Sequence, residues 1–225
     1  MTFLETQEPI YIDFHNHNSI RKESNVIEIT SIHLGKEPKN HNFYTIGKHP
    51  WWTTEVLKSE EIERLKKHYN SPYCLALGEM GLDKLKGPEL KYQEDILRSQ
   101  LEVAQELNAP VIIHCVRAYD QLLKIKREFP KIKNWCIHGY ARNSVLAGQL
   151  IHEGFYLSLM PQQRINSQKL SLLQSVSIDR LFLETDSMPR TSIEEIYTQT
   201  AEILELSVRS LQQQIMLNAK SFFDI

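Results

Sequence analysis

The 225-residue chain lacks several features that mark particular protein classes. No run of 18 apolar residues is present, which excludes a membrane-spanning helix. A basic segment followed by an apolar one, the mark of a secretory signal, is also missing, so we expect no such signal. Cysteine is scarce: Cys74, Cys115 and Cys136 form no Cys-x-x-Cys pair, so we expect reduced core thiols in a cytoplasmic protein. Without repeats, low-complexity tracts or an obvious linker, the simplest expectation is a single domain over residues 1–225.

Charge of one sign is not in excess either. The 26 Lys and Arg against 28 Asp and Glu give a formal net charge of −2, which argues against non-specific binding along a nucleic-acid backbone but allows a small basic pocket for a phosphate. Ordinary shares of hydrophobic (41%) and charged (24%) residues exclude collagen-like, coiled-coil and largely disordered chains. The nine histidines stand out, because histidine is the commonest metal ligand and the usual acid or base at neutral pH.

Short apolar runs alternate along the chain with longer amphipathic segments. The runs are rich in β-forming residues and predict strands near 10–14, 26–32, 43–47, 73–78, 110–115, 134–138, 154–159 and 180–185. Apolar residues at helical spacing predict helices near 54–68, 89–107, 118–129, 144–152, 167–175, 192–205 and 208–223.

This alternation with short connections predicts parallel strands joined by right-handed crossovers. Eight strands favour a TIM-type (β/α)8 barrel. The segments between the first three strands carry no helical period, so we expect the barrel to be shortened or irregular in its first two crossovers. A doubly wound open sheet is the alternative fold, but no Gly-rich phosphate loop supports it.

Residues that can bind metal stand at the ends of five predicted strands. His15 and His17 are two residues apart and therefore project from the same face of the first strand, as a two-nitrogen clamp would. Four more such residues close later strands: Glu79, His114, His138 and Asp186. The carboxyl ends of barrel strands meet at one mouth. Because buried charged and imidazole groups are costly unless something pairs them, the six together predict a metal site.

Six ligands exceed what one zinc ion needs, which indicates two divalent ions bridged by a carboxylate. Imidazole and carboxylate without thiolate suit Zn, Mn, Co or Fe, or Mg at the carboxylate end. Asp13 shares the face of His15 one layer deeper, so it is a candidate acceptor that fixes the imidazole tautomer. Glu184, two residues before Asp186, is a candidate for the same role, with an ion pair in the core as an equal alternative.

A smaller group of residues is a candidate for binding substrate. His49 follows the third predicted strand and faces the same mouth, so we expect it to contact substrate or a phosphate, with a role in structuring the loop as the alternative. Arg117 and Arg142, after the fifth and sixth strands, are candidate phosphate contacts, and Lys48 and Lys84 could add local positive charge. Each of these cations, taken alone, is an ordinary surface residue.

Several motifs occur in a specific order along nearly the whole chain. They are Asp13-x-His15-x-His17, Gly47-x-His49-Pro50, Gly78-Glu79-x-Gly81-Leu82-Asp83, Pro110-Val-Ile-Ile-His114, His138 and Glu184-Thr185-Asp186. In these motifs and their order the chain resembles the TatD-like metal-dependent hydrolases of the amidohydrolase superfamily. The resemblance implies a TIM-type barrel with a two-metal centre. It assigns one metal to His15, His17 and Asp186, the other to His114 and His138, and a bridging position to Glu79.

Many members of that family are described as metal-dependent deoxyribonucleases, so the resemblance implies DNA or a small phosphodiester as substrate. Asp186 is then the candidate general base, and Glu79 is the second candidate catalytic residue. The chain departs from the family at three segments that face substrate there: Val116 replaces a usual Arg, the sixth-strand motif reads His138-Gly-Tyr-Ala-Arg142, and the loop after Asp186 is reduced to residues 187–190.

Two alternatives therefore remain. The same site could act on an amide, a lactone or a small phosphate ester, because the trimmed segments leave the substrate open. A non-catalytic metal-binding protein is the second alternative, although only a metal would require all six ligands. Nothing in the sequence indicates a membrane or a protein partner.

Overall fold

The structure, a computed structural model, describes residues 10–17, 25–38, 42–160, 167–188 and 191–225. The chain forms two compact units, one of residues 31–138 and one of residues 1–30 with 139–225, and each is described by itself below. Among the described residues, every helix falls short of the length or the apolar character that a membrane crossing requires. The prediction of a single domain stays a prediction.

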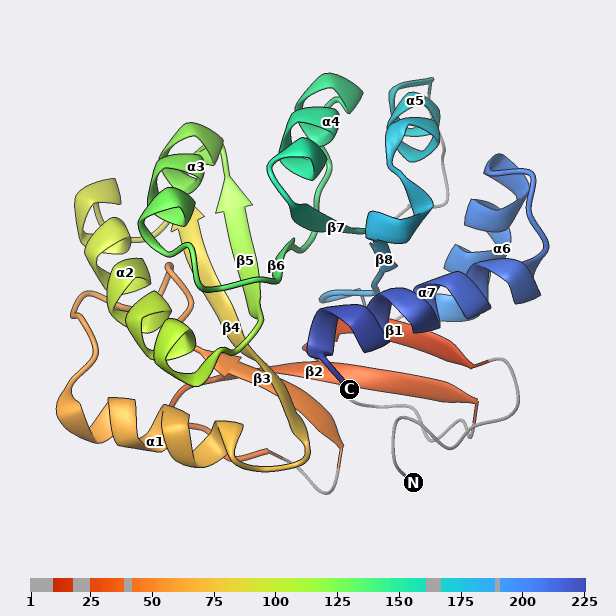
Figure 1. Ribbon diagram of the computed structural model, residues 1–225. Coiled ribbons are helices and arrows are strands. Elements are labelled where there is room, and N and C mark those ends of the chain that lie inside the picture. The colour runs from red at the N-terminus through yellow and green to blue at the C-terminus, as the bar shows by residue number, and fades with distance from the viewer. Residues whose placement is uncertain (1–9, 18–24, 39–41, 161–166, 189–190) are drawn as a thin grey trace. The chain divides into compact units, whose positions relative to one another are not determined.

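The unit of residues 31–138 contains a parallel sheet flanked by helices (Figure 1). Its strands β3 (Phe43–Gly47), β4 (Cys74–Asp83), β5 (Val111–Val116) and β6 (Trp135–Ile137) are hydrogen-bonded neighbours in chain order. Three helices connect them: α1 (Ser59–Tyr69), α2 (Leu90–Leu107) and α3 (Tyr119–Glu128). The predicted strand–helix alternation is confirmed in this unit.

Helix α2 shows why the pattern folds this way. Leu97, Leu101 and Ala104 follow one another at spacings of four and three, Ile96 precedes Leu97, and all four are buried, which places one apolar stripe against the sheet. The helix ends where Asn108 adopts a left-handed conformation at φ 53°, a frequent way to close a helix because an Asn side chain tolerates it.

Helix α1 begins at Ser59 instead of near residue 54. Its first turn is fixed by Glu61, whose side chain accepts a hydrogen bond from the backbone N–H of Lys58 at 2.8 Å. Just before it, the backbone N–H of Leu57 is bound by Ser99 on α2. Residues 54–57 therefore form a loop before the helix, and the contact between Leu57 and Ser99 is a tertiary one that the apolar spacing does not reveal.

Strand β4 is longer than the apolar run from which it was predicted. It continues to Asp83, pairing Met80 with Ile113 and Gly81 with His114 on β5. The expectation that Glu79 ends the fourth strand is therefore wrong, because the strand continues through Gly81 to Asp83 in register with β5. In the structure Gly81 marks a close approach of two backbones inside the sheet, which is the other meaning of a glycine within a strand.

The unit of residues 1–30 and 139–225 contains β1 (Tyr11–Asn16), β7 (Phe155–Leu159), β8 (Leu181–Leu183) and the first part of β2 (Val26–His33). Strand β1 pairs with β2 and β7 pairs with β8, all in parallel, and Asn16, the last residue of β1, bridges to Asp186. The helices of this unit are α4 (Ser144–His152), α5 (Ser167–Ser175), α6 (Ile193–Ile203) and α7 (Val208–Phe223), with a short 3-10 helix at Ile178–Arg180.

Aromatic packing joins β1, β8 and α7 in this unit. Phe14 stacks on Phe182 with ring centroids 3.9 Å apart, and Phe222 meets both rings edge-on. On α6, the buried Tyr197 hydroxyl accepts a hydrogen bond from the N–H of Ile12 and donates one to its carbonyl. These contacts fix β1, which carries His15. The expected irregular crossovers fall in part on residues 18–24 and 39–41, which lie outside the described residues.

Gly81 gives a direct test of the backbone approach between β4 and β5. Its φ of +152° is one that L side chains rarely adopt, and a Cβ there would lie 1.9 Å from the carbonyl oxygen of His114. We expect Gly81→Ala to lower the free energy of unfolding by more than about 4 kcal/mol, or to prevent folding. Urea denaturation followed by circular dichroism measures this change in the free energy of unfolding.

Gly148 on α4 is the matched control, because nothing lies within 4 Å of a Cβ built there. Gly148→Ala should raise the free energy of unfolding by about 0.5–1 kcal/mol, as expected for alanine in a helix interior. Equal stabilities of the two variants would contradict the close approach at Gly81.

Candidate metal centre

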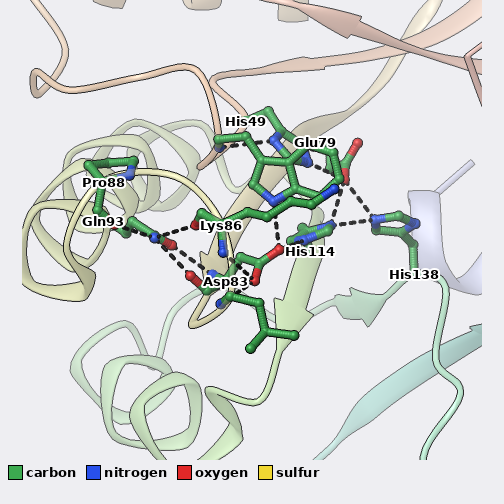
Figure 2. A network of polar contacts seen from close by, with 10 residues as sticks. His49, Glu79, Asp83, Lys86, Pro88, Gln93, His114 and His138 are labelled. Atoms are coloured by element: carbon green, nitrogen blue, oxygen red, sulfur yellow. Dashed lines mark hydrogen bonds and ion pairs between the residues drawn. The ribbon is translucent and has the colours of Figure 1, made fainter.

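In the unit of residues 31–138, three imidazole rings lie around one carboxylate oxygen (Figure 2). Glu79 is buried on β4, and its Oε1 lies 3.0 Å from Nε2 of His49, 3.0 Å from Nδ1 of His114 and 2.7 Å from Nε2 of His138. These residues come from the loop after β3, from β4, from β5 and from the end of β6. We call Glu79, His49, His114 and His138 the Glu79 cluster.

His49 takes part in this cluster as a hydrogen-bond donor. The backbone N–H of Trp51 donates to its Nδ1 at 3.1 Å, so in the neutral ring the proton is on Nε2, which faces Glu79. Burial lowers the pKa of His49, and the opposing effect of Glu79 does not outweigh it, so the ring is neutral at pH 7. His49 therefore orients the carboxylate of Glu79 through an N–H···O bond.

Asp83 holds the opposite side of the His114 ring. Its Oδ2 lies 3.1 Å from His114 Nε2 and accepts the indole N–H of Trp51 at 2.6 Å, while its Oδ1 accepts the backbone N–H groups of Leu85 and Lys86. Burial raises the pKa of Asp83, but these hydrogen bonds outweigh it and the net pKa is lowered. Asp83 is therefore an ionised carboxylate, which can only accept hydrogen bonds.

The tautomer of His114 follows from this environment. Because Asp83 can only accept, Nε2 of His114 carries a proton, and the neutral ring then presents a lone pair at Nδ1 towards Glu79 Oε1, 3.0 Å away. Two electron-rich atoms at that distance require a cation or a second proton between them. This chemistry fits a divalent metal, and an acidic partner on the far nitrogen is typical of metal-binding histidines.

A second layer fixes Asp83 in turn. Gln93 on α2 accepts the backbone N–H of Asp83 at 2.7 Å, and its amide donates to three carbonyls around the loop of residues 83–88. Lys86 lies over the Trp51 ring at 4.1 Å. Asp83 and Trp51 were not among the predicted site residues. The available signal was the period of two in β4, since Glu79, Gly81 and Asp83 share one face of a strand.

A separate group of possible ligands lies in the other unit. His15 on β1, His17 just after it and Asp186 after β8 each offer a ligand atom, and these atoms all lie within 4.8 Å of one another. His17 Nε2 is 3.4 Å from Asp186 Oδ1, and both side chains are about one-third exposed, whereas His15 is fully buried. We call these three residues the Asp186 cluster. Nitrogen and carboxylate donors without thiolate also fit a divalent metal.

Backbone hydrogen bonds and a buried carboxylate place the Asp186 cluster. The N–H of Asp186 donates to the carbonyl of His15, and the N–H of His17 donates to the carbonyl of Asp186. Both oxygens of Asp13 accept hydrogen bonds from Thr185, one from its backbone and one from its hydroxyl. Burial raises the pKa of Asp13 to about 7 against these hydrogen bonds. The predicted roles of Asp13 and Glu184 as partners of the ligands stay predictions.

The candidate cations lie in different surroundings. Lys48 is buried and forms an ion pair with Glu61 at 2.7 Å, so its charge is already balanced by a carboxylate. Arg117 follows β5 with a left-handed backbone at φ 55°, and Arg142 is exposed two residues before α4. The predicted phosphate contacts of Arg117 and Arg142 stay predictions, as does that of His49, whose two ring nitrogens face Trp51 and Glu79.

Asp83→Ala tests the support of His114 independently of any activity. The substitution removes the acceptor of four donors in a buried site, so we expect the free energy of unfolding to fall by about 3–5 kcal/mol. Chemical denaturation of the metal-free protein measures the loss. Asp95→Ala is the control, because Asp95 on α2 is half-exposed and its ion pair with Arg98 is a long one, at 4.0 Å. That variant should lie within about 0.5 kcal/mol of the parent, and a similar small effect of Asp83→Ala would contradict the network.

Comparisons with known proteins identify the family of the chain. The family model "TatD related DNase" matches residues 17–224. The chain is 26% identical over 218 residues to a 3'-5' ssDNA/RNA exonuclease TatD of Erwinia tasmaniensis, covering 87% of this chain and 83% of that protein. It is 27% identical over 225 residues to an uncharacterised metal-dependent hydrolase of Methanocaldococcus jannaschii, covering 90% and 87%.

Solved structures of TatD proteins share the fold. A TatD homologue from Escherichia coli superposes with a TM-score of 0.79 at 19% identity, over 96% of this chain and 98% of that one. A TatD family hydrolase from Entamoeba histolytica gives 0.76 at 15% identity, over 96% and 99%. The predicted TIM-type (β/α)8 fold is confirmed. The chain belongs to the TatD-related DNase family and is a metal-dependent hydrolase that acts on phosphodiester bonds.

Proposed function

We propose that the chain degrades single-stranded nucleic acid by hydrolysing its phosphodiester bonds with two divalent metal ions. The observation that carries the proposal is the position of His114 between two carboxylates, with Nε2 3.1 Å from Asp83 and Nδ1 3.0 Å from Glu79. In support of a nucleic-acid substrate, the relative from Erwinia tasmaniensis is named as a single-stranded DNA and RNA exonuclease. DNA remains the first substrate to test, with a small phosphodiester as the simpler one.

One ion is assigned to the Asp186 cluster and one to the Glu79 cluster, where His114 and His138 are its imidazole ligands. The donors are imidazole and carboxylate, so Zn, Mn, Co or Fe suit both clusters, and Mg suits the carboxylates. Glu79 as a ligand shared by both ions stays a prediction from the family resemblance. A cytoplasmic location also stays a prediction, supported by three free cysteines that are all buried.

When bound, such ions polarise phosphate oxygens and lower the pKa of a coordinated water. The residues of this chain supply orientation and proton transfer. His49 donates its Nε2–H to Glu79 and so fixes the direction of that carboxylate. Asp186 has a side chain that is 29% exposed and follows a strand end tied down by Asp13 and Thr185. The side chain of Asp186 is therefore accessible to solvent and held in place by its neighbours, which supports its assignment as the general base.

Metal binding gives a prediction that does not depend on knowing the substrate. Mn²⁺ or Zn²⁺ at roughly 100 times its dissociation constant should raise the melting temperature by about 5–10 °C. His114→Ala should remove most of that rise. His152→Ala is the control, because His152 is exposed at the end of α4 and its loss should leave the rise intact. No metal in elemental analysis and no rise in the parent would contradict the metal centre.

Asp186→Asn tests the role of the proposed base. A rate loss of about 10²–10⁴-fold in kcat on single-stranded DNA is expected, because general-base catalysis contributes that much, with the melting temperature of the metal-free protein nearly unchanged. Asp224→Asn is a matched control: both aspartates have a left-handed backbone, Asp186 at φ 48° and Asp224 at φ 57°, but Asp224 caps the end of α7.

The substrate panel is chosen so that its outcomes separate the alternatives. Single-stranded DNA, a bis-aryl phosphodiester and a cyclic amide are offered with Mn²⁺, Mg²⁺ or Zn²⁺. Activity confined to the amide would overturn the proposed nuclease and favour the alternative reaction. Full turnover of Asp186→Asn on DNA would overturn only the role of Asp186.

A further inference from the structure

An exposed indole lies beside the Glu79 cluster. Trp52 is 64% exposed, and its ring centroid is 4.7 Å from that of His49 with the planes tilted by 34°. His49 in turn is 3.0 Å from the carboxylate of Glu79. Single exposed apolar side chains are common on protein surfaces, but this one is separated from the proposed reaction centre by a single imidazole ring.

The position of Trp52 is fixed by neighbouring rings. Trp51 and His33 both meet it edge-on, with centroids 5.8 Å away, and the segment before it is anchored because Trp51 donates to Asp83. The backbone of the loop after β4 also closes on this segment, since a Cβ on Gly87 would lie 2.6 Å from the carbonyl oxygen of Pro50. An aromatic surface held in this way loses little freedom when a ligand binds.

The two adjacent tryptophans differ in what they can offer a ligand. The groups of Trp51 already interact with other parts of the protein: its N–H is bonded to Asp83, and Lys86 lies over its ring. Trp52 packs one side against His49 and keeps most of its surface in solvent. Only Trp52 therefore combines closeness to the cluster with an accessible aromatic surface.

We propose that Trp52 is a stacking platform for a nucleobase next to the scissile phosphodiester. The proposal rests on the proposed function and narrows its substrate to strands whose bases are unpaired and can lie flat on the indole. Stacking on an aromatic side chain tolerates every base, because each base has a π-face. The platform therefore favours single strands over duplexes without selecting a sequence.

The test compares Trp52→Ala, Trp52→Leu and Trp52→Phe with the parent enzyme on a single-stranded oligonucleotide. Loss of one base stack should raise KM by about 5- to 150-fold. The value of kcat should change little, because the stack is made in both the ground state and the transition state. Trp52→Phe should retain most of the affinity, whereas Trp52→Leu should resemble Trp52→Ala. Tyr92→Ala is the control, because Tyr92 is another exposed aromatic, 54% accessible on α2.

Abasic substrates show whether the indole acts through a base. In the parent, replacing one base of the oligonucleotide at a time by an abasic sugar should raise KM at one position by the same factor as Trp52→Ala. In Trp52→Ala the same replacement should have no further effect. Normal cleavage with equal KM for intact and abasic strands at every position would overturn the stacking proposal and leave the nuclease intact.

Binding gives a readout that does not need turnover. The anisotropy of a fluorescein-labelled decathymidylate should report weaker binding to Trp52→Ala than to the parent or to Tyr92→Ala. If no nucleic acid is cleaved by the parent, the proposed function fails, and equal dissociation constants for the parent and Trp52→Ala would then overturn the platform as well.

Discussion

The hydrogen bond from Nε2 of His114 to Asp83 determines the chemistry of the Glu79 cluster. An ionised carboxylate can only accept, so its place on one side of the ring decides which nitrogen of His114 carries a lone pair. That lone pair and the carboxylate of Glu79 face each other across 3.0 Å. The cluster is thus arranged for a cation, and His49, with its proton directed at the same oxygen, orients the carboxylate.

The backbone makes this arrangement possible. Glu79 and Asp83 both lie on β4, separated by Gly81, whose missing side chain lets β4 approach the backbone of His114 on β5. One strand therefore supplies both carboxylates that face His114, and the adjacent strand supplies the ring between them. Gln93, by binding the backbone around Asp83, ties the same network to α2. The hydrogen bond from the Trp51 indole to Asp83 then connects this network to the loop that carries Trp52.

The sequence predicted the alternation of strands and helices, because apolar periodicity records burial directly. It also singled out the imidazole and carboxylate residues of both clusters as candidates, with His49 expected to contact substrate. Their roles as metal ligands stay predictions. It did not predict the length of β4, where Gly81 serves a close approach and not a turn. No role was predicted for Asp83, although it shares a face of β4 with Glu79. Trp51 was missed because its role depends on a tertiary contact with Asp83, and such a contact leaves no period in the chain.

Anomalous diffraction from crystals soaked in Mn²⁺ tests the central claim, that Asp83 prepares His114 Nδ1 to bind a metal beside Glu79. We predict an anomalous peak at ligand distance from Nδ1 of His114 and from a Glu79 oxygen, and a second peak at the Asp186 cluster. A first ion bound through another atom of His114, or no ion near Glu79 in crystals that carry Mn²⁺ elsewhere, would contradict the account.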